Sequence, residues 1–167
     1  MFPNDLLAEA EALLGTARAR GWHITTAESC TGGLIAGLLT AIGGSSDVVD
    51  GGAVTYSNAA KTRMLGVPAE LIATHGAVSE PVARAMAEGA KATAAVDLGI
   101  AVTGVAGPGG GTVEKPVGLV WFGLASAAGI TAESRIFPGD RTAVRLATVR
   151  HAIGLLRRAL DDGRRFV

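Results

Sequence analysis

The sequence contains few of the residues on which several common kinds of protein site depend. Among its 167 residues, cysteine occurs once, at Cys30, and tyrosine once, at Tyr56. A single cysteine excludes an internal disulfide and a zinc site built from several cysteines, and it is compatible with a reducing compartment. The three histidines form no HExxH or paired pattern. We therefore expect a protein without a bound metal.

An excess of one charge and long apolar runs are also missing. Fifteen basic residues balance 15 acidic ones, and the tight basic clusters at 157–158 and 164–165 lie near the C-terminus. This balance gives no basic surface for nucleic acid. No apolar run reaches the roughly 18 residues that a membrane span needs, and no basic segment precedes the first apolar residues. We expect a cytoplasmic protein that binds neither nucleic acid nor membrane.

Apolar residues make up 49% of the chain and charged residues 18%, which is the composition of a folded domain with one core. Apolar side chains at helical spacing predict helices over 4–20, 31–42 and 79–95, a short helix from 57, one or two turns over 68–74, and a final helix after 140. Asn4 is a plausible cap for the first helix, and Gly21 suits the position after its end. Strands are predicted at 23–27, 48–56, 97–105, 117–125 and 130–137.

Strands that alternate with helices indicate an α/β domain spanning 1–167, with helices on both faces of the sheet. The short connection at 127–129 predicts one antiparallel hairpin, which would make the sheet mixed. The apolar seam of the last helix would pack on the sheet or on a second subunit. Because ligands of such sheets bind beyond the carboxyl ends of the strands, the turns at 28–33, 56–61 and 103–111 are expected to meet there.

The first of these turns, Glu28 to Gly33, places a hydroxyl between a strand and a helix. Ser29 is a candidate nucleophile, and free N–H groups at the helix start would suit an anion or an oxyanion. The simpler interpretation is that Ser29 or Thr31 only caps the helix. Cys30 is a second candidate nucleophile, although a small buried cysteine is the commoner finding.

A serine nucleophile needs a base, and histidine or lysine is the usual choice. None of His23, His75 and His151 lies in a pattern that resembles a catalytic triad. Lys61 follows Tyr56 by five residues, where a strand passes into a helix, so it is either the base or an exposed helix lysine. The glycine-rich stretch 103–111 lacks the Gly-Lys-Ser/Thr of a phosphate loop and is either a flexible connection or the wall of a pocket.

Six blocks of the sequence together resemble one known family. They are TAESCTGG at 26–33, GAVTYSN at 52–58, HGAVSE at 75–80, TGVAGP at 103–108, KPVG at 115–118 and FPGDR at 137–141. In this order they resemble the CinA C-terminal domain family, the stand-alone nicotinamide-nucleotide amidohydrolases. The resemblance implies a three-layer α/β/α sandwich with a mixed, mostly parallel sheet, a homodimer, and a small-molecule nucleotide substrate. The implied reaction deamidates nicotinamide mononucleotide in pyridine nucleotide recycling and needs no cofactor.

The resemblance also assigns roles to individual residues. The nucleophile falls on Ser29, its base on Lys61 and an assisting tyrosine on Tyr56. Residues expected to line the substrate fall on Thr31, Gly32, Gly33, Ser46, Thr103, Gly104 and Arg141. Gly109 departs from the family, whose members often carry an acidic residue there, and no counterpart of the molybdopterin-binding-like domain of full-length CinA proteins lies in these residues.

In this mechanism Lys61 must be neutral, so we expect it to be desolvated or to lie beside another cation such as Arg141. Amides near 31–33 would hold the oxyanion, or the same helix start would hold the 5′-phosphate. Two other functions stay open: a non-catalytic module that binds a nucleotide or a partner, and an amidase for a different carboxamide.

Overall fold

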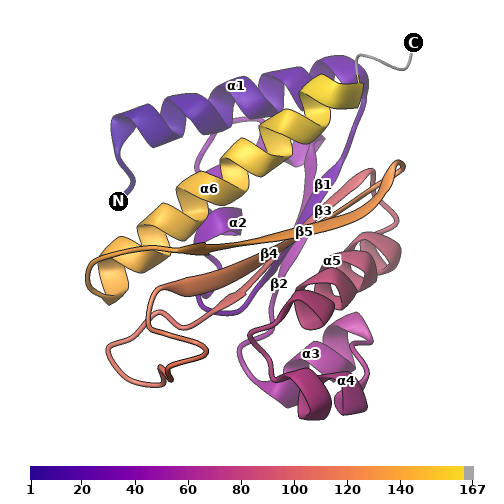
Figure 1. Cartoon of the computed structure of the whole chain (residues 1–167). Coiled ribbons are helices and arrows are strands. Elements are labelled where there is room, and N and C mark those ends of the chain that lie inside the picture. The colour runs from indigo at the N-terminus through magenta and orange to yellow at the C-terminus, as the bar shows by residue number, and fades with distance from the viewer. Residues whose placement is uncertain (164–167) are drawn as a thin grey trace.

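A five-stranded sheet runs through the centre of residues 1–163, which are the residues that the computed structural model describes (Figure 1). The strands are β1 Ile24–Glu28, β2 Val49–Val54, β3 Leu98–Gly104, β4 Leu119–Ser126 and β5 Gly129–Ile136. Their order across the sheet is β2-β1-β3-β4-β5. β1 pairs in parallel with β2 and β3, whereas β4 is antiparallel to both β3 and β5. The predicted mixed sheet and its late hairpin are therefore confirmed.

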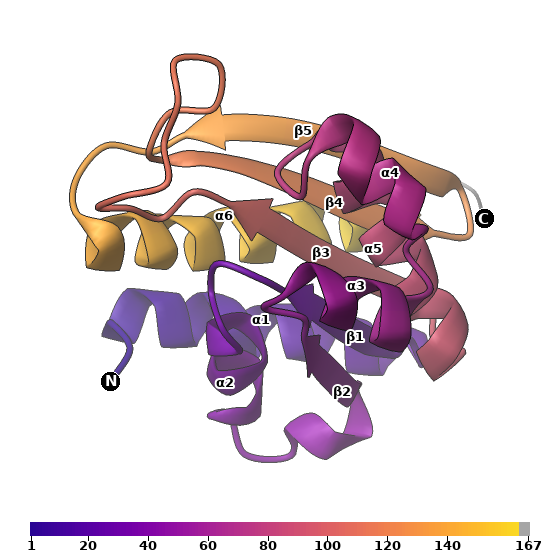
Figure 2. The same ribbon diagram turned by 90° about the horizontal axis from the view of Figure 1, so that it is seen from below.

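Helices cover both faces of this sheet, as Figure 2 shows. One face carries α1 Asn4–Arg20, α2 Leu34–Thr40 and α6 Arg141–Asp162, and the other carries α3 Asn58–Leu65, α4 Ala69–His75 and α5 Glu80–Ala94. A short 3₁₀ helix, η1 Ser45–Asp47, precedes β2. Each face of the sheet has its own cluster of buried apolar side chains. The α/β class and the three-layer sandwich are confirmed.

The apolar seam of α6 faces the interior of this chain. Val149, Ile153, Leu156 and Leu160 are at most 1% exposed, and they belong to the cluster that α1 and the sheet also line. Of the two partners considered for this seam, the sheet layer is therefore correct. Burial of apolar side chains of this size stabilises a fold by about 1.5–3 kcal/mol each, so α6 is firmly docked.

Two helix starts differ from the prediction. The helix predicted from residue 31 begins at Leu34, because Gly32 and Gly33 adopt φ values of 60° and 97°, which lie in the left-handed region. Asn4 is the first helical residue of α1 and does not cap it; Pro3 occupies the cap position, without a side-chain hydrogen bond. By contrast, Gly21 ends α1 in the left-handed conformation, as predicted.

Candidate active site

The turns that follow β1, β2 and β3 meet at one edge of the sheet. The Ser29 N–H donates to the Val102 carbonyl at 3.0 Å, and the Thr55 N–H donates to the Glu28 carbonyl at 2.8 Å. Parallel pairing of the three strands places their carboxyl ends side by side. The expected meeting of the three turns is therefore found in the structure.

Ser29 and Lys61 are in direct contact at this edge. Lys61 Nζ lies 3.0 Å from Ser29 Oγ and donates a second hydrogen bond to the Thr55 carbonyl at 2.8 Å. Lys61 belongs to the first turns of α3, whose start is fixed by a hydrogen bond from the Ala60 N–H to Ser57 Oγ. Only 1% of Lys61 is exposed, so it is not a surface lysine. Ser29 does not cap α2, which has no side-chain cap.

The environment of Lys61 makes its amine easier to deprotonate than that of an exposed lysine. Burial lowers the pKa of Lys61 below its ordinary value of 10.5. Among residues 1–163, no ion pair includes this ammonium group. Desolvation is therefore the cause of the shift. Arg141, which was the expected alternative cause, instead directs its guanidinium to Tyr56 and Gly107.

The other candidate nucleophile and the candidate histidines do not take part. Cys30 is 5% exposed, and burial raises the pKa of its thiol to about 11, so it is protonated near neutral pH. His23 precedes β1 at the opposite end of the sheet, where it faces Asp97. His151 Nε2 lies 2.6 Å from Glu133 Oε1. Lys61 is therefore the basic side chain that contacts Ser29.

Glu28 is a buried carboxylate that sequence reasoning did not assign. It is 1% exposed, and five donors from the described residues converge on its two oxygens. They are Thr26 Oγ1 at 3.2 Å, Thr31 Oγ1 at 2.6 Å, and the amides of Gly33, Ile35 and Ala36 at 3.2, 3.0 and 2.8 Å. Glu28 therefore satisfies the free amides at the start of α2 from outside the helix.

This arrangement engages two of the amides near 31–33 that were expected to hold an oxyanion or a phosphate. The Gly33 amide is bonded to Glu28, and the Gly32 amide donates to the Ser29 carbonyl at 3.0 Å. The Thr31 hydroxyl also donates to Glu28, and Thr31 is fully buried. These three residues shape the turn around Ser29, and the Gly32 amide, the Gly33 amide and the Thr31 hydroxyl are occupied within it, whereas the Thr31 amide donates to no described residue. In the stretch 29–33, the amides of Cys30 and Thr31 donate to no other described residue; Cys30 is 5% exposed and Thr31 is fully buried.

Tyr56 and Arg141 form a second pair at the same edge. Arg141, the first residue of α6, donates from Nη2 to Tyr56 Oη at 2.7 Å and from Nη1 to the Gly107 carbonyl at 2.7 Å. Tyr56 is 59% exposed. The α6 start thus links the turn after β2 to the loop after β3.

Thr103 and Gly104 end β3 beside the Ser29 turn. Thr103 is 1% exposed, and its hydroxyl donates to the Ala77 carbonyl at 2.8 Å, which ties the segment before α5 to this edge. A Cβ on Gly104 would lie 2.8 Å from the Leu119 carbonyl oxygen, so the close approach of β4 requires glycine there. Both residues lie at the site, and their visible contacts are structural.

Ser46 does not lie with the others. It is exposed in η1, which precedes β2, and Asp47 of the same turn contacts Arg18 near the end of α1. Since β1 and β2 are parallel, η1 lies at the amino end of these strands, whereas Ser29 follows the carboxyl end. The expectation that Ser46 lines the substrate is therefore not supported by the geometry of the single chain.

The loop between β3 and β4 is anchored and is not a free connection. Lys115 Nζ donates to the His75 carbonyl at 2.6 Å, and Arg141 holds the Gly107 carbonyl as described above. These contacts exclude a free connection, while residues 108–114 of the loop are exposed; that the loop is the wall of a pocket stays a prediction. A Cβ on Gly109 would meet no atom within 4 Å, so this position has open space for a side chain.

Arg145 is the second residue that sequence reasoning missed. From α6 it donates Nε to the Cys30 carbonyl at 3.1 Å and Nη2 to the Thr31 carbonyl at 2.9 Å. The signal in the sequence was its position four residues after Arg141, which places both arginines on the same side of the helix start.

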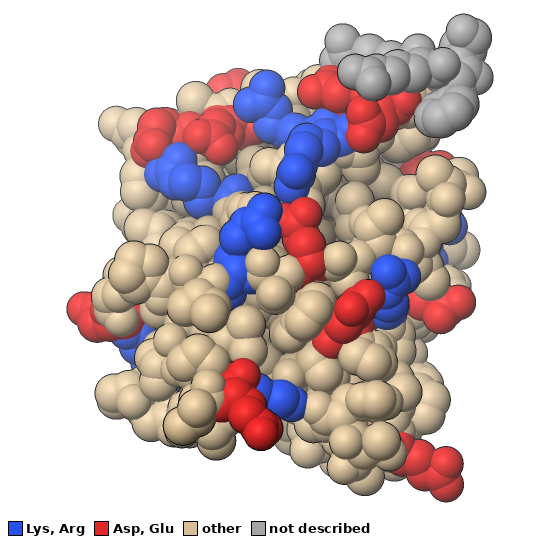
Figure 3. All heavy atoms as spheres, viewed as in Figure 1, with Lys and Arg blue, Asp and Glu red and all other residues tan. Residues whose placement is uncertain are grey.

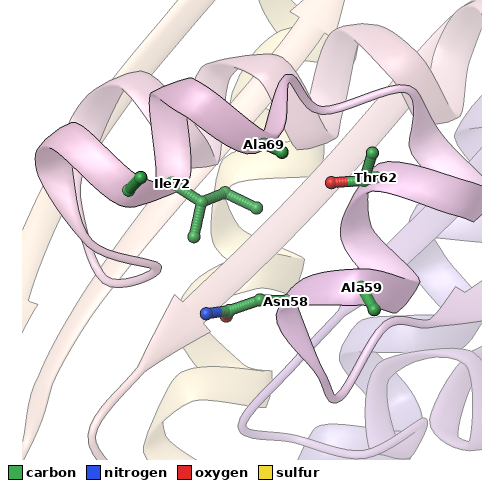
Figure 4. A pocket seen from close by; sticks show the side chains of 6 residues that line it. Asn58, Ala59, Thr62, Ala69 and Ile72 are labelled. Carbon is green, nitrogen blue, oxygen red and sulfur yellow. The ribbon is translucent and has the colours of Figure 1, made fainter.

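Three further observations concern a surface hollow, metal-binding groups and membrane-spanning helices. A hollow between α3 and α4 is lined by Asn58, Ala59, Thr62, Ala69, Ile72 and Ala73, and neither Ser29 nor Lys61 lines it (Figure 4). Residues 1–163 contain no group of three or more His, Cys, Asp and Glu side chains placed to hold a metal ion. In the same residues, no helix is both long and apolar enough to cross a membrane.

The fold and the site together define an α/β protein in which a buried lysine contacts a half-buried serine at the carboxyl edge of a mixed sheet. The sequence matches the CinA C-terminal domain over residues 7–160, and the chain belongs to this family. A CinA-like protein of Anaeromyxobacter sp. (strain K) is 54% identical over 150 residues, which cover 90% of this chain and 37% of that protein. The chain thus spans little more than a third of this relative.

Solved structures of similar length agree with the fold. The competence/damage inducible protein CihA from Agrobacterium tumefaciens is 48% identical, with a TM-score of 0.92 over 96% of this chain and 98% of that one. A CinA superfamily protein from Klebsiella pneumoniae is 39% identical, with a TM-score of 0.90 over 94% of this chain and 98% of that one. The predicted family is confirmed.

Proposed function

We propose that this chain is a serine–lysine amidohydrolase that converts nicotinamide mononucleotide to nicotinic acid mononucleotide and ammonia. One observation carries the catalytic part: Lys61 Nζ lies 3.0 Å from Ser29 Oγ while Lys61 is buried and forms no ion pair with a described residue. The substrate follows from the resemblance of the site blocks to the nicotinamide-nucleotide amidohydrolases. The cytoplasmic location and the homodimer stay predictions.

The first step is attack by Ser29. A neutral lysine amine has two N–H donors and one lone pair. In the structure Lys61 Nζ donates to both the Thr55 carbonyl and Ser29 Oγ. Once neutral, Lys61 keeps the bond to Thr55 and turns its lone pair to the Ser29 hydroxyl, which then donates to Nζ. As Lys61 removes the hydroxyl proton, Ser29 Oγ bonds to the carboxamide carbon, and the electron pair of the C=O double bond moves to oxygen.

The oxyanion that forms needs a hydrogen-bond donor close to Ser29. The amide of Cys30 directly follows the nucleophile and donates to no other described residue, so it is the donor that we assign. This assignment moves the oxyanion contact one to three residues earlier than the amides of residues 31–33 that were expected from the sequence.

Collapse of the tetrahedral intermediate completes acylation. The C=O double bond re-forms, the C–N bond breaks, and the proton held by Lys61 passes to the leaving nitrogen, which departs as ammonia. Lys61 is then neutral again and removes a proton from a water molecule that attacks the acyl-enzyme ester. The ester C–O bond breaks, the proton returns to Ser29, and the pyridine carboxylic acid is released. No cofactor enters these steps.

Arg141 is assigned to substrate binding, and Tyr56 keeps the assisting catalytic role that the resemblance gives it. The guanidinium of Arg141 lies at the exposed rim of the site, where its remaining N–H groups suit the phosphate of a nucleotide. Tyr56 presents an exposed ring beside it, with its hydroxyl oriented by Arg141.

Ammonia release from a panel of carboxamides tests the proposal. We expect release from nicotinamide mononucleotide that exceeds release from nicotinamide and from non-nucleotide amides. Ser29→Ala should lower kcat by about 10³-fold or more while nucleotide binding and Tm change little. Ser134→Ala, on the edge strand β5, is the matched control and should keep wild-type kcat.

Different outcomes reject different parts of the proposal. Wild-type turnover by Ser29→Ala would reject the nucleophile. A larger rate on another carboxamide would reject the substrate alone. Nucleotide binding by the wild type without ammonia release from any member of the panel would favour the non-catalytic module.

A further inference from the structure

The turn that carries Ser29 is held by a cation from the far end of the chain. Arg145 donates to the carbonyls of both Cys30 and Thr31, across separations of 115 and 114 residues. In the described residues Arg145 forms no ion pair with a carboxylate, so these two carbonyls are its hydrogen-bond partners. Gly32 leaves room for this contact, because a Cβ there would already lie 3.4 Å from Arg145 Nη2.

Peptide geometry connects these bonds to the amide that follows Ser29. In a planar trans peptide the C=O and the N–H point in opposite directions, so fixing one fixes the other. The Thr31 carbonyl, held by Arg145, shares a peptide with the Gly32 N–H, which donates to the Ser29 carbonyl at 3.0 Å. The Ser29 carbonyl shares the next peptide with the Cys30 N–H. Two peptide planes thus lead from the guanidinium to the Cys30 amide.

We propose that Arg145 is a positioning residue that holds the Ser29 turn so that the Cys30 N–H faces the oxyanion formed at Ser29. This inference rests on the proposed function, and it adds a residue that does not touch the substrate. A bidentate guanidinium suits the role, because it fixes two carbonyls in one plane, whereas a lysine ammonium is a point donor. The charge of Arg145 also adds a positive potential beside the developing oxyanion.

A matched control lies on the same helix. Arg150 also makes two contacts from α6, to Asp5 at 2.9 Å and Glu9 at 3.1 Å, but both partners belong to α1. These contacts lie on the side of the molecule that α1 and α6 cover, where acidic and basic side chains intermingle (Figure 3). Arg150→Ala therefore removes an arginine and its bonds from α6 without touching the Ser29 turn.

The experiment compares Arg145→Ala, Arg145→Lys and Arg150→Ala with the wild type in two assays. The first measures kcat and KM for deamidation of nicotinamide mononucleotide. The second measures the rate at which a fluorophosphonate labels Ser29, followed by mass spectrometry, because this rate needs an activated serine and an oxyanion site but no nucleotide. Circular dichroism and Tm establish that each variant is folded.

We expect Arg145→Ala to lower kcat and the labelling rate by about tenfold or more, with KM changed less than about threefold. Arg145→Lys should recover part of both rates, and millimolar guanidinium should raise the rates of the alanine variant. Arg150→Ala should stay within about twofold of the wild type. If the alanine variant does not fold, Arg145→Lys carries the comparison, with a loss of kcat at unchanged KM as the expected result.

A folded Arg145→Ala protein with wild-type kcat or wild-type labelling would overturn the inference, as would a loss confined to KM. If the wild type releases no ammonia from the nucleotide yet Ser29 is labelled, the proposed substrate fails, and the labelling rates still decide the role of Arg145. A wild type that neither releases ammonia nor is labelled would overturn both, since the turn would then activate no serine.

Discussion

Glu28 and Lys61 are both 1% exposed and lie on neighbouring turns, yet the chain surrounds them in opposite ways. Glu28 receives five hydrogen bonds, three of them from amides at the start of α2. Lys61 has two oxygen partners and forms no ion pair with a described residue. Burial alone therefore does not decide the state of an ionisable side chain. The donors and acceptors around it do.

The largest effect on activity and stability is expected when Lys61 is replaced by arginine, whose charge is permanent. Lys61→Arg should lower kcat by about 10²-fold or more, because arginine does not give up its proton at accessible pH. It should also destabilise the fold by about 3 kcal/mol, because a permanent cation would be buried without a carboxylate. The measurements are ammonia release and urea unfolding. Lys91→Arg, on α5, is the control and should keep wild-type activity and stability. A Lys61→Arg protein with wild-type kcat or wild-type stability would contradict the assignment of Lys61 as a buried base.

A smaller loss of unfolding free energy is expected from a change at Glu28. Glu28→Gln keeps the shape of the side chain but replaces one acceptor oxygen with an NH₂ donor, which would face donors that now point at the carboxylate. The expected cost is about 2 kcal/mol of unfolding free energy, measured by urea denaturation. Glu80→Gln, which breaks the exposed contact with Arg84, should cost less than about 0.5 kcal/mol. Equal losses of unfolding free energy in the two variants would show that the five hydrogen bonds to Glu28 stabilise the fold no more than the exposed ion pair does.

The smallest effect concerns pH. Because the pKa of Lys61 is lowered in the folded state, the unfolded chain binds a proton that the folded chain has released. Stability should therefore rise with pH between the folded pKa and the ordinary value of 10.5. Lys61→Met removes this contribution, so the wild type should gain up to about 1.4 kcal/mol per pH unit relative to the variant within that window. Urea unfolding of both proteins between pH 7 and 10 measures the difference, and parallel curves would contradict it.

Local patterns predicted the order of the elements because apolar spacing and glycine positions report directly on helices, strands and their ends. The same logic placed the turns of Ser29, Lys61 and Gly107 at one edge. Glu28 was missed because its partners are mostly backbone amides, which every residue has. Arg145 was missed because its partners are carbonyls more than 100 residues away. Ser46 as a substrate-lining residue stays a prediction, because a motif resemblance gives the residue type but not the end of the sheet at which it lies in a single chain.

The docking of α6 also determines the order in which the parts of the site fold during synthesis. Ser29, Lys61 and their strands are synthesised before α6, which carries Arg141 and Arg145. Closing a loop of more than 100 residues costs entropy that only the finished core of α1, α6 and the sheet offsets. A nascent chain can therefore pair Ser29 with Lys61 before its turn is braced, and the complete arrangement of the site arises only when the C-terminal helix has left the ribosome.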